Sequence, residues 1–126
     1  MDSRMTRTFQ LWKDFRFEAA HQLTMVPVGH QCSNLHGHSY LVRVHCEGLL
    51  DPSRDWVVDY SEISRVVSPI IKVLDHSFLN DVIPLETTAE NLSFWLGEQV
   101  KLSLPSASAV EVFETPTTSV KCPIVR

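Results

Sequence analysis

Three residues in one short stretch have the types and spacing of metal ligands. His36 and His38 are separated only by Gly37. If they open a strand, both imidazoles point to the same face, roughly 6–7 Å apart at the backbone. Cys32 lies upstream, where a loop can fold it over the same site. Neutral imidazoles and thiolates are zinc ligands, so this stretch predicts a zinc site.

A third histidine continues an apolar strand pattern nearer the start of the chain. Apolar side chains at odd positions of residues 8–19 predict one buried strand face, and His21 follows in the same phase. Antiparallel pairing would bring His21 beside His36 and His38. Three neutral histidines would leave a fourth zinc position open, as in catalytic zinc sites. The alternative is a set of strand-end histidines that hydrogen-bond to the backbone.

Cys32 is open to three interpretations: a fourth zinc ligand, a reactive thiolate or a structural thiol. A thiol beside a metal and a histidine can act as a base or a nucleophile. A fourth protein ligand would instead close the site and predict a purely structural zinc. Cys46 falls on the apolar face of a strand and is predicted to be core, and Cys122 is assigned no role.

Two acidic residues also need an explanation. Asp75 and His76 are adjacent at the end of a predicted helix, where a turn can combine them into a proton relay. Alternatively, His76 only interacts favourably with the helix dipole. Glu114 shares the strand phase of Val110 and Val112, so its carboxylate is predicted to face inward and to need a partner. That partner is either a protein cation or a ligand with paired N–H groups, such as the edge of a pterin or guanine.

The elements that must position these residues predict an α+β fold. Alternating patterns indicate strands over 8–19, 36–46 and 110–114, with a fourth strand after Pro116, and helical spacing covers 59–74 and 88–100. We therefore expect a four-stranded antiparallel sheet with two helices on one face. Thr87 or Thr88 caps the second helix, since Thr87 and Glu90 have capping-box spacing. Residues 79–86 are expected to form a loop.

Composition excludes several classes of protein. The net charge of −4 argues against bulk binding to nucleic acid or to a membrane surface. Three cysteines cannot form a closed set of disulfides, which favours a reduced, cytoplasmic setting. The first residues lack the apolar core of a signal peptide, and no apolar run approaches the roughly 20 residues that span a bilayer. We expect one domain over residues 1–126, with a core small enough to favour oligomerisation.

The order of these motifs resembles the 6-pyruvoyl-tetrahydropterin synthase family. The resemblance rests on F-R-F-E-A-A-H at 15–21, C-x-x-x-H-G-H at 32–38, L-D-H at 74–76, T-x-E-N at 88–91, and Glu114. Cys32 lies four residues before His36, which is similar to the bacterial branch that makes 6-carboxytetrahydropterin for queuosine and other deazapurines. The animal pyruvoyl synthases place this cysteine further upstream.

The resemblance implies an architecture and a reaction. The fold would be the tunnelling fold, whose sheets join between subunits into a barrel, commonly a homohexamer of two trimers with active sites at the interfaces. The substrate would be 7,8-dihydroneopterin triphosphate. The products would be 6-carboxy-5,6,7,8-tetrahydropterin, acetaldehyde and triphosphate, with zinc as the cofactor.

The resemblance also implies residue roles. The implied zinc ligands are His21, His36 and His38. Cys32 would be the general base and would form a relay with Asp75 and His76 of a neighbouring subunit. Glu114 would anchor the pterin ring, with help from Thr88 and its backbone.

Other functions stay open on the sequence alone. A pyruvoyl synthase would use the same site but eliminate triphosphate without carbon–carbon cleavage. A zinc-stabilised pterin-binding module would bind without turnover. A zinc hydrolase is disfavoured because the chain has no H-E-x-x-H motif.

Overall fold

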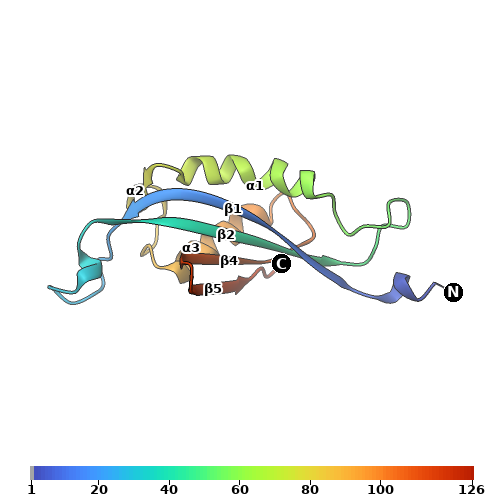
Figure 1. Cartoon of the computed structure of the whole chain (residues 1–126), viewed down its shortest axis with the longest axis horizontal. Helices are drawn as coiled ribbons and strands as arrows, with labels where there is room; N and C mark the ends of the chain where they lie inside the picture. Colours follow the sequence, from blue (N-terminus) through green and yellow to red (C-terminus); the bar gives the residue numbers. More distant parts are fainter. Residues whose placement is uncertain (1) are drawn as a thin grey trace.

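The computed structural model describes residues 2–126 as one layer of strands and one layer of helices (Figure 1). Two single turns of 3-10 helix lie at Ser3–Thr6 and Gln31–Ser33. The larger elements, in chain order, are β1 (Phe9–His21), β2 (His36–Gly48), α1 (Tyr60–Leu74), β3 (Ser77–Phe78), α2 (Leu79–Val82), α3 (Ala89–Val100), β4 (Ala107–Thr115) and β5 (Thr118–Pro123).

The strands form one open sheet in the order β3-β1-β2-β4-β5. All neighbours are antiparallel except β3, which runs parallel to the end of β1. The four predicted strands and their antiparallel pairing are therefore confirmed, and β3 adds a fifth, parallel strand at the edge that was not expected. The fifth strand contains only two residues, which is too short to leave an alternating pattern in the sequence.

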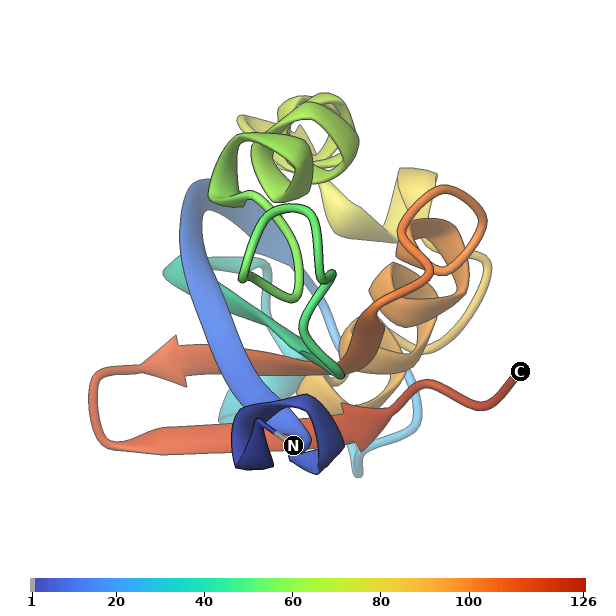
Figure 2. The ribbon, with the colours of Figure 1, turned by 90° about the vertical axis from the view of Figure 1, so that its right-hand side faces the viewer.

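One face of the sheet is covered by α1 and α3, as Figure 2 shows. Side chains that share the phase of the histidines on β1 and β2 point toward these helices, and Phe17, Tyr40, Val42 and Val44 are fully buried there. Cys46 is also part of this core, as predicted. The helices thus close the sheet face that carries His21, His36 and His38 at its end.

Capping side chains fix where the helices begin. The Asp59 carboxylate accepts a hydrogen bond from the Ser61 N–H, which starts α1 at the expected place. At α3 the Thr88 hydroxyl accepts from the Asn91 N–H, so Thr88 rather than Thr87 is the N-cap. Residues 79–86 are not wholly a loop, because the single helical turn α2 begins at Leu79. None of the helices formed by residues 2–126 is long and apolar enough to cross a bilayer.

The packing of α3 against the sheet should contribute measurably to the free energy of unfolding. Leu96 is fully buried, whereas Phe94 on the same helix is 48% exposed. We expect Leu96→Ala to lower the free energy of unfolding by about 2–5 kcal/mol, because it leaves a cavity in the core. Phe94→Ala should cost about 1 kcal/mol or less. Urea unfolding at one fixed protein concentration measures both, and equal losses would contradict the assigned packing.

Candidate metal centre and active site

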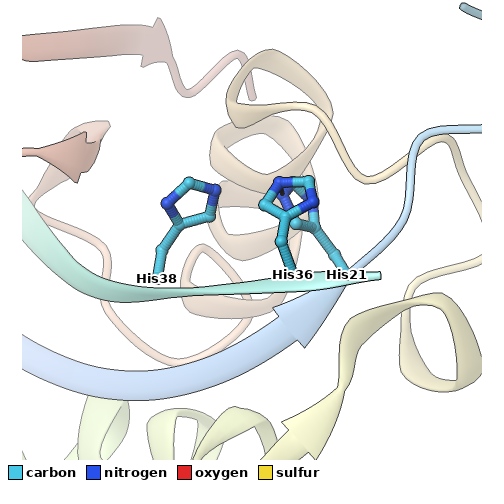
Figure 3. A group of neighbouring side chains, drawn as sticks. All are labelled: His21, His36 and His38. Atoms are coloured by element: carbon cyan, nitrogen blue, oxygen red, sulfur yellow. Dashed lines mark hydrogen bonds between the residues drawn. The ribbon is translucent and has the colours of Figure 1, made fainter. Parts of the chain in front are cut away.

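The register of β1 against β2 brings three histidines together. His21 is paired directly with His36, and His38 faces Ala19 across the same antiparallel ladder. The three rings project from the strand ends into one space (Figure 3). Each offers one nitrogen, and the three nitrogens lie within 4.8 Å of one another. This spacing is short enough for a single ion to contact all three side chains.

Backbone carbonyls orient two of these rings. His21 Nδ1 lies 2.8 Å from the carbonyl oxygen of Thr87, and His36 Nδ1 lies 2.7 Å from that of Asn34. A carbonyl can only accept, so each Nδ1 carries the proton and each Nε2 presents a lone pair. Hydrogen bonding of the second ring nitrogen is how proteins orient histidines that ligate metals.

The bare nitrogens require a positive charge between them. His21 Nε2 and His36 Nε2 are 2.9 Å apart, a contact that is repulsive unless a proton or a metal ion bridges the two lone pairs. Zinc–nitrogen bonds of about 2.0–2.1 Å in a tetrahedral site would place the two nitrogens roughly 3.3 Å apart, so little movement is needed.

Two further features of the histidines are compatible with a bound metal ion. His38 Nε2 is buried without a hydrogen-bond partner. His21 is 1% exposed, and this burial lowers the pKa of its imidazole. The ring therefore stays in the neutral form that binds metals at pH 7. A divalent ion at these three residues would satisfy all the unpaired nitrogens and keep a fourth position open.

Cys32 lies beside the histidines without joining their cluster. A hollow of about 320 Å³ is lined by His21, Leu23, Gln31, Cys32, His36, His38 and Glu114. The metal-ligand group found among residues 2–126 contains the three histidines and leaves Cys32 out. The Cys32 N–H donates to Nδ1 of His30 at 3.0 Å, which places Cys32 in a short 3-10 turn at the rim. In the described part of the chain, Cys32 is half-buried and forms no disulfide, and it lies outside the group of three histidines.

Glu114 shares that hollow and reaches beyond it. Its side chain is 26% exposed, and its Oε2 lies 3.4 Å from His38 Nε2. Among the residues that the structure describes, no lysine or arginine forms an ion pair with Glu114. Its carboxylate also faces a second hollow of about 690 Å³, lined in part by Arg16 and Phe113. The carboxylate is thus left available to a ligand that spans the two hollows.

Asp75 and His76 form the predicted pair at the end of α1. The Asp75 carboxylate accepts from the Glu18 N–H at 2.9 Å, and the His76 N–H donates to the Glu18 carbonyl oxygen at 2.6 Å. His76 adopts a left-handed backbone with φ +58°, which brings its Nδ1 within 3.1 Å of Asp75 Oδ2. The hydrogen bond from Glu18 lowers the pKa of Asp75, so the carboxylate is ionised beside the imidazole.

His76 and Cys32 line different hollows. The hollow of His76 is also lined by Ala20, Gly37 and Ser39, and it shares His38 with the hollow of Cys32. The His76 side chain is 80% exposed. A strained backbone at a solvent-exposed histidine is typical of functional sites rather than of packing.

Sequence reasoning missed the residues that support the histidines. Thr87 is buried, and its carbonyl oxygen holds His21, while Asn34 holds His36 in the same way. Backbone carbonyls have no residue-type signature, so only the position of Thr87 just before a helix pointed to this segment. Thr88, expected to help bind a ligand, uses its hydroxyl oxygen to cap α3. Its carbonyl oxygen accepts from the Leu92 N–H at 2.9 Å, so the hydrogen of its hydroxyl and its backbone N–H are the groups that could serve the role expected above.

Metal binding is testable on the chain without any substrate. We expect the wild-type protein to bind about one zinc ion per chain, and His36→Ala to weaken this binding by more than about 100-fold, since losing even an outer hydrogen bond costs 10- to 100-fold. His45→Ala is the matched control, because His45 lies on the opposite face of β2 and pairs with Glu111 at 2.9 Å. Competition with a chromophoric chelator measures both, and equal affinities for the two variants would contradict the assigned site.

Comparison with known proteins identifies the family of the chain. Residues 10–123 match the family described as 6-pyruvoyl tetrahydropterin synthase. A 6-carboxy-5,6,7,8-tetrahydropterin synthase of Synechocystis sp. is 34% identical over 120 residues, which cover 88% of this chain and 90% of that protein. The protein of the same name from Haemophilus influenzae is 30% identical, with 86% and 94% covered. A dihydroneopterin monophosphate aldolase of Pyrococcus furiosus is 33% identical over 71% of this chain and 72% of its own length.

The fold has solved counterparts as well. The structure of the Caenorhabditis elegans 6-pyruvoyl tetrahydropterin synthase superposes with a TM-score of 0.85 at 22% identity, over 93% of this chain and 96% of that one. The expected tunnelling fold is thereby confirmed, with a fifth short strand in its sheet. The chain belongs to the 6-pyruvoyl tetrahydropterin synthase family and is an enzyme that acts on pterins.

Proposed function

We propose that the chain converts 7,8-dihydroneopterin triphosphate and water to 6-carboxy-5,6,7,8-tetrahydropterin, acetaldehyde and triphosphate. One observation carries this proposal: Cys32 and Glu114 share a single hollow with His21, His36 and His38. Two relatives aligned over most of the chain bear the name of this synthase. We further propose that the residues 1–126 act as one domain, in the cytoplasm, in the synthesis of queuosine and related deazapurines.

Binding of the substrate uses the two ends of the hollow. The Glu114 carboxylate can accept a pair of N–H groups from the 2-amino-4-oxo edge of the pterin. Thr88 would assist at that end through its backbone. A zinc ion held by His21, His36 and His38 would act as a Lewis acid that polarises the hydroxyl groups of the substrate side chain.

Proton transfer is assigned to Cys32 and to the Asp75–His76 pair. Cys32 removes a proton from the substrate side chain as general base, from the open side of the hollow. His76, held and polarised by the ionised Asp75, returns a proton. Because His76 and Cys32 of one chain line different hollows, we propose that the catalytic His76 comes from a neighbouring copy in a homohexamer of two trimers.

Two related reactions compete with this one. A 6-pyruvoyl synthase would eliminate triphosphate and keep the carbon chain, as the name of the C. elegans neighbour indicates for that protein. An aldolase, as the P. furiosus relative is named, would cleave the side chain to a hydroxylated aldehyde instead of acetaldehyde. We favour the carboxy synthase because its name recurs among the relatives that combine at least 30% identity with alignment over more than 80% of both chains. A non-catalytic pterin-binding module would have no use for a free thiol beside the histidines.

Incubation of the zinc-loaded protein with 7,8-dihydroneopterin triphosphate tests the proposal. We expect acetaldehyde and 6-carboxytetrahydropterin in equal amounts, and a fall in kcat of about 100-fold or more in Cys32→Ala, the usual effect of losing a general base. Cys122→Ala is the matched control, since Cys122 lies on β5 and takes no part in the hollow. Zinc content should be unchanged in both variants.

Each other outcome assigns a different function. Turnover without release of any aldehyde would identify a pyruvoyl synthase. Release of glycolaldehyde triphosphate together with 6-hydroxymethyl-7,8-dihydropterin would identify an aldolase. Pterin binding without any turnover would leave a binding module. Loss of zinc in Cys32→Ala would make Cys32 a ligand rather than a base.

A further inference from the structure

We propose that Glu86 is a positioning residue that clamps the Cys32 loop, residues 22–35, over the histidine site. The part of this inference that concerns catalysis depends on the function proposed above, because it takes Cys32 as the general base. The part that concerns the loop stands on contacts within the chain. Nothing in the sequence motifs singled out Glu86.

The Glu86 carboxylate gathers donors from one point of the loop. It accepts from the Thr24 N–H at 2.9 Å and from the Met25 N–H at 2.6 Å. The Thr24 hydroxyl lies 3.2 Å from each carboxylate oxygen. These hydrogen bonds lower the pKa of Glu86, so the group is ionised and its bonds are charge-assisted. The pairing of β1 with β2 ends at His21, and beyond it the Glu86 carboxylate accepts the backbone hydrogen bonds of Thr24 and Met25.

Packing does not hold this part of the loop. Met25 is 83% exposed and Val28 is fully exposed, so the apolar side chains of the loop tip are not buried in the core. Gly29 adopts a left-handed backbone with φ +90° in the same segment. With little apolar area buried, the position of the tip depends on its hydrogen bonds.

Two hydrogen bonds between the ends of the loop connect the residues bound by Glu86 to Cys32. The Leu23 N–H donates to the Cys32 carbonyl oxygen at 3.0 Å, and Leu23 directly precedes Thr24. The Gln22 side-chain amide donates to the Ser33 carbonyl oxygen at 2.7 Å, which ties the same two sides together. A shift of Thr24 therefore moves Cys32 relative to the histidines.

Glu86 is itself fixed to the metal side of the site. The Asn91 side-chain amide, on α3, donates to the Glu86 carbonyl oxygen at 3.0 Å. The next residue, Thr87, supplies the carbonyl oxygen that orients His21. Two consecutive residues thus hold the thiol-bearing loop and a metal ligand, which sets the distance between them.

Glu86→Ala and Glu86→Gln test the clamp, with Asp81→Asn as the control. Asp81 is an exposed carboxylate on α2, and the same loss of charge there should change nothing. Glu86→Ala should accelerate hydrogen exchange of the Thr24 and Met25 amides by about tenfold or more, because charge-assisted hydrogen bonds are lost. Exchange on β1, β2 and α3 should stay as in the wild type. Glu86→Gln keeps one acceptor oxygen, so its effect should be smaller.

Two further readouts connect the loop to the thiol and to catalysis. In a Cys122→Ser background, the rate of Cys32 alkylation by iodoacetamide should change several-fold in Glu86→Ala, while zinc content and melting temperature stay unchanged. With the pterin substrate, kcat should fall about tenfold or more and KM should change less than about threefold.

The outcomes separate the clamp from the proposed function. Unchanged amide exchange and unchanged Cys32 alkylation in Glu86→Ala would overturn the clamp, whatever the activity. Loss of zinc or general unfolding in both Glu86 variants would also overturn it, since Glu86 would then support the fold rather than the loop. If the wild type lacks pterin turnover, the proposed function fails, while exchange and alkylation still decide the clamp.

Discussion

The pairing register of β1 and β2 is the constraint on which the site depends. It sets His21 opposite His36 and places His38 two residues further along β2, on the same face of the sheet, which the helices cover. A register shift of one residue would turn these side chains to the other face of the sheet and disperse the cluster. The buried side chains of Phe17, Tyr40 and Val42 fix the register, so the same core packing that stabilises the sheet also assembles the metal site.

The segment before α3 adds the contacts that orient His21 and hold the loop of Cys32. Thr87 holds His21 by a carbonyl oxygen, which leaves its Nε2 lone pair directed at that of His36. Burial lowers the pKa of His21, and its ring shares one space with the rings of His36 and His38, so an added cation would meet three imidazoles there. Glu86, the neighbour of Thr87, binds the loop that carries Cys32. One of the three histidines and the loop that carries Cys32 are therefore held by two consecutive residues, Thr87 and Glu86.

Much of this architecture is readable from the sequence because its signals are periodic. The alternation that ends in His21 and the one that begins at His36 predict both strands and the histidine cluster, and Glu114 is found by its phase with Val112. The misses have physical causes. A two-residue strand and a one-turn helix are too short for any period. Thr87 acts through a backbone carbonyl, which no residue type encodes, and the reach of Glu86 to Thr24 depends on tertiary packing.

The central claim is an open site of three histidines with Cys32 beside it as a free thiol. X-ray absorption spectroscopy of the zinc-loaded protein tests it most directly. The account predicts only nitrogen and oxygen neighbours at about 2.0–2.2 Å, with the imidazole pattern of three histidines and no sulfur. A zinc–sulfur distance of about 2.3 Å would contradict it, because Cys32 would then close the site and could not serve as the base.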